Sequence, residues 1–226
     1  MSEVPVIVIS SPFPCCGKTT LALNLAAALW SDGYEVDLIA PKNELVERFL
    51  RQRRKLQETR KLDLYVPTLL SAIPAQPKSE KYIVIAIIPA ENFQQYAEIF
   101  NQAHTLITVV PSILSAFWNA ADGYLGMIWN AKKHIAARGI KAANWVVVPY
   151  LENPAATDGM HGLLEASRRY GFRVAEILPY RDAYNHVKDG YCAADMRQYN
   201  SVLNMAFADV YARREILQLT DFFWKK

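Results

Sequence analysis

Short apolar runs alternate along the chain with longer segments in which apolar residues recur every three or four positions. The runs are rich in valine and isoleucine, which is typical of strands buried on both faces of a parallel sheet. The sequence therefore predicts a strand near the start of the chain, followed by strands at Val36–Ala40, Lys81–Ile88, Thr105–Val110, Trp145–Tyr150 and Arg173–Leu178.

The periodic segments predict helices, because a spacing of three to four residues places apolar side chains on one helical face. These helices are expected at about 18–32, 43–61, 91–103, 115–138, 159–170, 182–188 and 201–223, while three prolines make 64–78 irregular. The alternation predicts one α/β domain over residues 1–226, a doubly wound, mostly parallel sheet with helices on both faces. Ligands of such sheets bind at the carboxyl ends of the strands.

Composition places few further limits on this fold. The chain has 226 residues, 52% of them hydrophobic, so one sizeable core is expected without disulfides or metals. Its three cysteines form no disulfide framework and no run is long enough to span a bilayer, so we expect a cytoplasmic protein without a membrane anchor. The net charge of +3 is compatible with nucleic acid but does not require it.

The first predicted strand runs into SSPFPCCGKTT, which matches the second half of the phosphate-loop pattern G-x-x-x-x-G-K-[ST]. Pro12 replaces the first glycine of that pattern, so an ordinary strand-to-helix turn is the alternative. Lys18 is expected to neutralise phosphate charge, and the Thr19 hydroxyl to hold Mg²⁺. The predicted phosphate contacts are Cys16, Gly17, Lys18, Thr19 and Thr20.

Two of the cysteines and two of the tryptophans are expected to have structural roles. Cys15 and Cys16 stand at the head of a predicted helix, where packing under the loop is expected and a thiol-reactive role is the alternative. Trp30 and Trp129 lie on apolar faces of predicted helices and are expected in the core.

The second predicted helix is strongly basic, with seven basic and four acidic residues over 44–63. Its apolar stripe contains Val46, Phe49 and Leu50, and the helical period places several basic side chains away from that stripe. These residues form either a solvated face or a surface for the phosphates of nonspecific DNA. The candidate DNA contacts are Arg48, Arg51, Arg54 and Lys55.

Four long segments of the chain are similar to a known family. They are SSPFPCCGKTTLALNLAAAL, ERFLRQRRKLQETRKLDLYVP, GMIWNAKKHIAARGIKAANWVVV and GLLEASRRYGFRVAEILPYRDAYNHVKDG. These segments resemble the ParA/MinD group of P-loop ATPases, and within that group the MipZ type that positions the division plane. The resemblance implies ATP or ADP and Mg²⁺ as cofactors, an ATP-dependent homodimer, nonspecific DNA binding, and a cell-division or partition protein as partner.

The departures from the family fall on its chemistry. Phe13 stands where the family has a signature lysine that reaches the partner's phosphates across the dimer. Ala40 and Ala86 stand where the family has aspartates beside the attacking water and Mg²⁺. The Asn-Arg that contacts adenine in the family is also absent, so the base is expected near Tyr150 or Tyr180.

Three functions remain open from the sequence. The first is a nucleotide-binding positioning or partitioning protein with weak or no ATP hydrolysis. The second is a pseudo-ATPase module that no longer binds nucleotide, because Pro12 and Pro14 lack N–H donors. The third is a small-molecule ATP-dependent ligase on the same fold, which would also need acidic residues near the phosphates.

Overall fold

The structure is a computed structural model that describes residues 3–60, 64–91, 93–111, 122–137, 144–151, 160–197 and 207–223. Two compact units make up the chain. The first unit comprises Met1–Val4, Thr19–Ile85 and Arg181–Lys226, and the second comprises Pro5–Lys18 and Ala86–Tyr180. That the whole chain is one domain stays a prediction.

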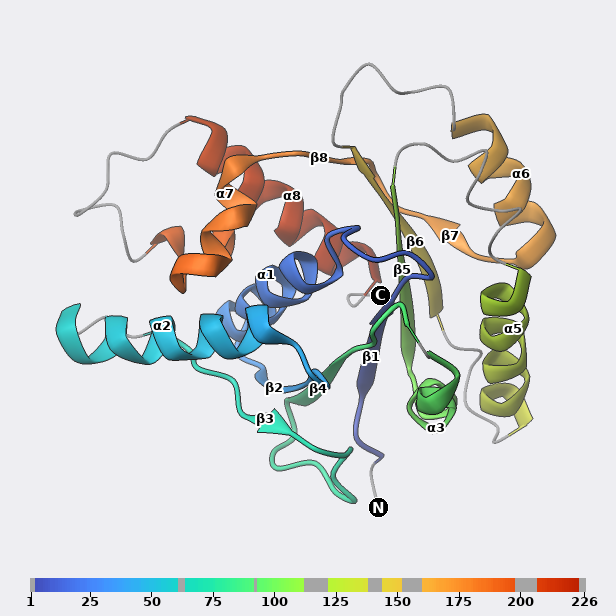
Figure 1. Ribbon diagram of the computed structural model, residues 1–226, viewed down its shortest axis with the longest axis horizontal. Helices are drawn as coiled ribbons and strands as arrows, with labels where there is room; N and C mark the ends of the chain where they lie inside the picture. The colour runs from blue at the N-terminus through green and yellow to red at the C-terminus, as the bar shows by residue number, and fades with distance from the viewer. Residues whose placement is uncertain are drawn as a thin grey trace. The chain divides into compact units, whose positions relative to one another are not determined.

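The second unit is a parallel sheet with helices packed on it (Figure 1). Its strands follow the order β1-β5-β6-β7, and β8 also pairs with β6. Their bounds are Val6–Ser10 (β1), Thr105–Pro111 (β5), Asn144–Leu151 (β6), Arg173–Val174 (β7) and Leu178–Pro179 (β8). The helical segments are Phe93–Tyr96 (η1), Ala97–Asn101 (α3), Asp122–Ala137 (α5) and Met160–Tyr170 (α6).

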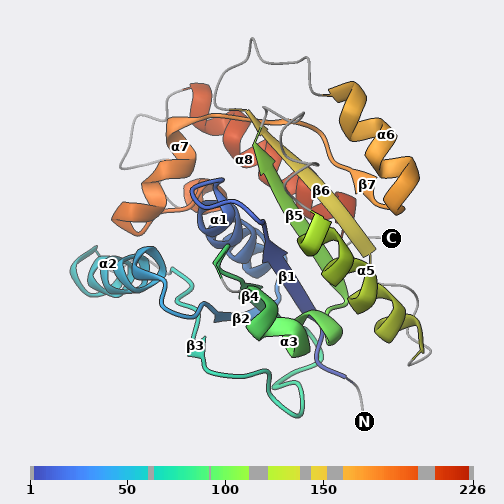
Figure 2. The ribbon, with the colours of Figure 1, turned by 45° about the vertical axis from the view of Figure 1, so that its right-hand side comes forward.

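The first unit contains strands in the order β3-β2-β4, with several helices around them (Figure 2). The strands are Glu35–Ile39 (β2), Leu69–Leu70 (β3) and Tyr82–Ile87 (β4), and the first unit contains β4 as far as Ile85. The helical segments are Lys18–Ser31 (α1), Glu44–Arg60 (α2), Asp182–Asn185 (α7), His186–Asp189 (η2), Ala193–Arg197 (η3) and Phe207–Phe223 (α8). Every residue of β4 is buried, as expected of an unbroken apolar run in a parallel sheet.

The predicted α/β fold with a mostly parallel sheet is confirmed, because every strand pairing given within the two units is parallel. Several finer predictions were wrong. The helix expected at 91–103 is a 3-10 turn followed by the short α3, and the strand expected at 173–178 is split into β7 and β8. The parts of the predicted helices at 61, 92, 115–121, 138, 159 and 201–206 lie outside the described residues.

The proline-rich segment 64–78 contains a short strand that the sequence did not predict, and Asp37 explains its order. The carboxylate of Asp37 is buried and accepts hydrogen bonds from the Tyr82 hydroxyl at 2.8 Å and the Thr68 amide at 3.1 Å. Lys78 pairs with the same carboxylate. A buried charge needs such partners, so Asp37 fixes the segment beside β2 and allows β3 to form.

The two tryptophans expected in the core differ in their surroundings. Trp30 is half-buried and stacks on Tyr65, with ring centroids 5.6 Å apart. Trp129 is 45% exposed, so its placement in the core was wrong. The apolar face of α5 that is buried contains Tyr124, Leu125 and Ile128, and Trp129 lies beyond its edge.

A buried ion pair holds α2 to the segment after η2. The Arg53 guanidinium forms two parallel hydrogen bonds with the Asp195 carboxylate, at 2.6 and 2.7 Å, and both side chains are buried. Arg53 also donates to the carbonyl oxygens of Gly190, at 2.9 Å, and Tyr65. These contacts satisfy a charged group that would otherwise be costly to bury.

Gly190 is required for this arrangement. Its φ of 89° is in the left-handed region, and a Cβ added there would lie 2.9 Å from the backbone nitrogen of Arg53. Only glycine lets the two backbones approach so closely.

We predict that Arg53→Ala lowers the free energy of unfolding by about 3–5 kcal/mol, because the Asp195 carboxylate would remain buried without its partner. Urea unfolding followed by circular dichroism measures the loss. Arg54→Ala is the matched control, since Arg54 is exposed on the same helix and its removal should cost within about 0.5 kcal/mol. Equal urea midpoints for the two variants would contradict the assigned role of Arg53.

Candidate phosphate-binding site

The loop between β1 and α1 has the backbone of a phosphate-binding turn. Cys15 and Gly17 both have positive φ, 53° and 84°, on either side of Cys16. Alternation of left- and right-handed residues points successive backbone N–H groups into one concavity, which favours an anion. Left-handed backbone is unusual for a cysteine, and Cys15 adopts it where the resembled family has glycine.

Lys18, the first residue of α1, lies inside this loop. Its side chain is only 9% exposed, and its ammonium donates a hydrogen bond to the Phe13 carbonyl oxygen at 2.8 Å. The Cys16 sulfur lies 3.6 Å from the same nitrogen. The lysine is thus already positioned among the loop's backbone groups, where a phosphate oxygen could take the place of the carbonyl as its partner.

The loop's two cysteines differ, and the expectation that both pack under the loop was wrong for Cys15. Cys16 is buried and Cys15 is exposed. The difference follows from the backbone, because the positive φ of Cys15 turns its side chain outward while Cys16 faces the Phe13 carbonyl.

Tyr150 lies beside the loop, as expected for a residue at the carboxyl end of β6. A Cβ added to Gly17 would be 4.0 Å from two carbons of the Tyr150 ring, so the glycine leaves room for close packing against it. Tyr180 directly follows β8, whose Leu178 pairs with Tyr150, and it is 46% exposed. The structure therefore places Tyr150 against the loop and Tyr180 one strand away.

A buried polar cluster supports the end of β1 beneath the loop. The Tyr124 hydroxyl is hydrogen-bonded to Ser10 at 2.5 Å and to Thr108 at 2.9 Å, and Trp145 donates to Thr108 at 3.0 Å. Burial raises the pKa of Tyr124, so its hydroxyl stays neutral. The sequence analysis missed this cluster, although Ser10 and Thr108 are polar residues within mostly apolar strands.

The surroundings of Thr19 do not suit a metal ion. Its hydroxyl oxygen accepts a hydrogen bond from the Asn43 side-chain nitrogen at 2.9 Å. The Asn43 side-chain oxygen accepts a hydrogen bond from the Val46 backbone amide. This bond caps α2 and fixes which end of the Asn43 side-chain amide faces Thr19. A donor, rather than a carboxylate, thus faces the predicted Mg²⁺ ligand, and Mg²⁺ prefers oxygen ligands.

The two positions at which the resembled family carries aspartates are buried methyl groups. Ala40 follows β2 and Ala86 lies near the end of β4, and both are buried. Among the described residues, no group of three or more His, Cys, Asp or Glu side chains could hold a metal ion. The residues of the loop fit a phosphate, whereas the predicted Mg²⁺ ligand, the Thr19 hydroxyl, has no such cluster beside it in the part of the chain that the structure describes.

The basic residues predicted to contact DNA are exposed on α2. Arg51, Arg54 and Lys55 face solvent, and Arg48 is also exposed but pairs with Asp189 at 3.9 Å and donates to the Lys188 carbonyl. The sequence analysis did not single out Arg53. Its spacing of four residues from Phe49 placed it on the apolar stripe, which was the signal that its charge is buried.

Comparisons with known proteins give similarities to one family model and to several solved structures of the same fold. The model of the family "ATPase MipZ" matches residues 115–223. Among curated proteins, none matches the chain in sequence. Within the described residues, no helix has the length and apolar character that crossing a membrane requires.

Three solved structures illustrate the similarity in fold. A variant of McdA from Cyanothece in complex with ATP has a TM-score of 0.60 and 14% identity, covering 98% of this chain and 96% of that one. MinD from Aquifex aeolicus has a TM-score of 0.58 and 18% identity, with 96% of each chain covered. A plasmid partition protein from Borrelia burgdorferi bound to AMPPNP has a TM-score of 0.57 and 13% identity, covering 96% and 98%.

The loop geometry leads to a stability prediction for Cys15. Cys15→Gly should raise the free energy of unfolding by about 1 kcal/mol, because glycine adopts a left-handed φ without the steric cost of a Cβ. Cys15→Ala separates this effect from loss of the thiol, and it should leave the free energy nearly unchanged. The measurement is urea unfolding of the three proteins. The same midpoint for the glycine and alanine variants would show that the residue is not left-handed.

The exposed face of α2 leads to a second prediction. If it binds DNA phosphates, Arg51→Ala with Arg54→Ala should flatten the log-log salt dependence of binding by about one unit per charge, equally on unrelated duplexes. Fluorescence anisotropy at several salt concentrations measures this slope. Lys133→Ala with Arg168→Ala removes the same charge from other exposed positions and should leave the slope unchanged. Unchanged slope and affinity in the α2 variant would mean that its basic face is only solvated.

Proposed function

Because the chain has the fold of the ParA/MinD-type P-loop ATPases and matches the MipZ ATPase family over residues 115–223, we propose that it is a nucleotide-binding positioning or partitioning protein. We further propose that it hydrolyses ATP weakly or not at all. Nucleotide binding and chemistry are treated separately below, since different residues support each.

The arrangement of Lys18 is the observation that supports nucleotide binding. Its buried ammonium and the left-handed residues Cys15 and Gly17 provide a cation and directed N–H groups at the start of α1. Anions bind at such helix N-termini because unpaired N–H groups and the helix dipole both favour negative charge. The adenine of ATP or ADP is proposed to lie near Tyr150, whose ring packs beside Gly17.

The replaced residues argue against efficient hydrolysis. Phosphoryl transfer depends almost entirely on positioning and charge neutralisation, and a cation supplied in trans is worth about 10³ to 10⁵ in rate. Phe13 carries no charge and cannot supply such a cation. Removing groups that orient a metal ion typically costs a further 10- to 100-fold, and Ala40 and Ala86 provide no carboxylate.

Mg²⁺ is proposed to contribute less than in a carboxylate-bearing site. When bound, it would neutralise phosphate charge and orient the phosphate oxygens. The residue able to contact it is Thr19, whose hydroxyl would first have to exchange the hydrogen bond from Asn43. Binding of nucleotide is therefore expected to depend little on Mg²⁺.

The remaining parts of this function rest on the family. A homodimer, contact with nonspecific DNA through α2, a division or partition partner, and a cytoplasmic location are proposed by resemblance. MinD from Aquifex aeolicus has been solved as a complex with the cell-division protein MinC, so proteins of this fold can work through protein partners.

One alternative has an observation in its favour. Pro12 and Pro14 offer no N–H groups, and the Phe13 carbonyl already holds Lys18. These features favour a pseudo-ATPase module that keeps the fold without binding nucleotide. A ligase is less favoured. Cobyrinic acid a,c-diamide synthase from Mycobacterium smegmatis shares the fold at a TM-score of 0.53 and was solved with ADP and magnesium. The carboxylates expected of such a site are absent from this chain at positions 40 and 86.

Calorimetric titration with ATP and ADP, with and without Mg²⁺, decides between the main proposal and this alternative. We expect both nucleotides to bind, and Lys18→Ala to weaken binding at least about tenfold because a charge-assisted contact to phosphate is lost. Tyr150→Ala should also weaken binding. Lys81→Ala, which removes an exposed lysine, is the control and should bind as the parent does.

Two results would contradict the proposal. Absence of binding by the folded parent protein would favour the pseudo-ATPase module. Undiminished binding after Lys18→Ala would show that nucleotide binds somewhere other than the loop.

A further inference from the structure

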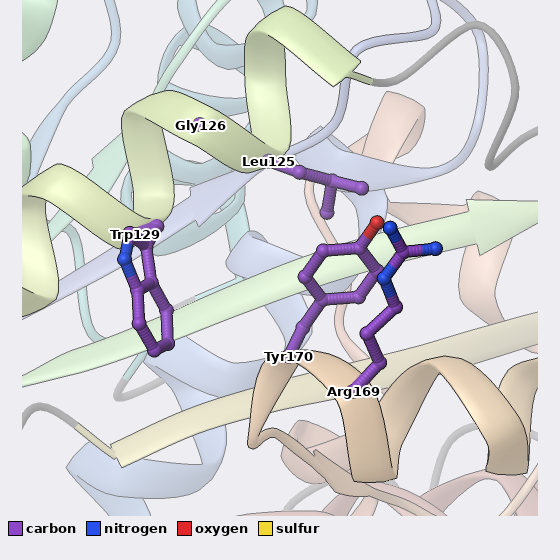
Figure 3. A pocket seen from close by; sticks show the side chains of 5 residues that line it. All are labelled: Leu125, Gly126, Trp129, Arg169 and Tyr170. Atoms are coloured by element: carbon purple, nitrogen blue, oxygen red, sulfur yellow. The ribbon is translucent and has the colours of Figure 1, made fainter.

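A surface pocket lies between α5 and α6 in the second unit, away from any residue used above for nucleotide. It has a volume of about 400 Å³ and is lined by Leu125, Gly126, Trp129, Arg169 and Tyr170. Figure 3 shows Trp129 descending from α5 on one side and Tyr170 rising from α6 on the other, with Arg169 alongside the tyrosine ring.

Gly126 keeps this pocket open. It is exposed, and a Cβ added to it would meet no atom within 4 Å. A glycine inside a helix costs about 1 kcal/mol relative to alanine, and no backbone requirement explains it here because its φ is not positive. The gap that it leaves is therefore available to an incoming group.

Cations lie over two of the rings that line the pocket. The Arg169 guanidinium lies over the Tyr170 ring, 5.3 Å from its centroid, and the Lys132 and Lys133 ammonium groups lie 5.7 and 5.8 Å from the centroid of the exposed Trp129 ring. Together α5 and α6 carry four basic and two acidic residues. A partner that enters the pocket is thus met by positive charge on either side, which disfavours basic partners and favours acidic ones.

The pocket combines the three residue types that dominate the binding energy of protein interfaces, namely tryptophan, tyrosine and arginine. From this combination and its charge, we propose that the pocket docks an acidic segment of a partner protein, with one aromatic side chain of that segment inserted between Trp129 and Tyr170. The carboxylates flanking that side chain would contact Arg169 and Lys133.

Other occupants fit less well. A small molecule normally has about 70–90% of its surface buried, but Trp129 is 45% exposed and Gly126 forms an open wall. Single-stranded nucleic acid needs several open aromatic faces for successive bases, and Arg169 already covers one face of Tyr170. The inference does not depend on the proposed nucleotide binding, and its test contains no nucleotide.

The test uses short, fluorescently labelled peptides as probes, with fluorescence anisotropy as the measurement. One peptide has a phenylalanine flanked by aspartates and glutamates, the second has alanine in place of the phenylalanine, and the third keeps the phenylalanine among lysines. We expect only the first to bind the full chain measurably below about 1 mM, with affinity that falls as salt is added.

Gly126→Leu fills the pocket and should weaken binding of the first peptide at least about tenfold. Gly162→Leu is the matched control, because Gly162 is also an exposed helical glycine with no atom within 4 Å of an added Cβ, yet it does not line the pocket. It should bind as the parent does. Arg169→Glu should weaken binding and remove most of its salt dependence. Circular dichroism and urea midpoints establish that each variant is folded.

Several outcomes would overturn the inference. They are no binding of the acidic aromatic peptide below about 1 mM, equal binding of the alanine peptide, or equal effects of Gly126→Leu and Gly162→Leu. Binding of an oligothymidylate that Gly126→Leu abolishes would assign the pocket to nucleic acid instead. Self-association in sedimentation velocity that Gly126→Leu abolishes would assign it to a second copy of this chain.

Discussion

The turn from β1 into α1 is the constraint on which the candidate site depends. Its backbone must reverse within a few residues while pointing N–H groups inward, and this requires left-handed conformations at Cys15 and Gly17. Ser10, at the end of β1, is hydrogen-bonded to Tyr124, which is also hydrogen-bonded to Thr108. These bonds fix the end of the strand from which the loop begins. Lys18 is then buried among the loop's own backbone groups, and every proposed contact to nucleotide follows from that placement.

Positions 13, 40 and 86, at which the resembled family carries charged groups, are uncharged in this chain. An anion-binding loop normally works beside carboxylates that hold Mg²⁺, whereas here Ala40 and Ala86 are methyl groups and Asn43 donates to Thr19. The lost carboxylates also remove repulsion toward the phosphates, so binding can persist when positioning of a metal and of an attacking water is lost. Binding without turnover would suit a protein that responds to nucleotide by associating with a partner, and the pocket between α5 and α6 is the surface that we propose for one.

The sequence was sufficient to predict the features that depend on local pattern. The runs of valine and isoleucine predicted the buried parallel strands, and Gly17-Lys18-Thr19 placed the loop at the head of α1. Long-range partners could not be predicted in the same way. The pairing of Arg53 with Asp195 joins residues far apart in the chain, and the order of 64–78 depends on Asp37. Trp129 was assigned to the core because periodicity identifies an apolar face without fixing where burial ends.

The central claim is that the loop binds ATP without efficient hydrolysis, and single-turnover phosphate release tests it most directly. Protein is in excess over ATP, at concentrations where calorimetry shows the nucleotide to be bound, and quenching with acid before the phosphate is counted removes product release from the measured rate. The account predicts that the parent forms phosphate at least about 10³-fold more slowly than an intact ParA/MinD-type ATPase. Release within about tenfold of an intact ParA/MinD-type ATPase, abolished by Lys18→Ala, would contradict it, because the missing lysine alone should cost about 10³ or more.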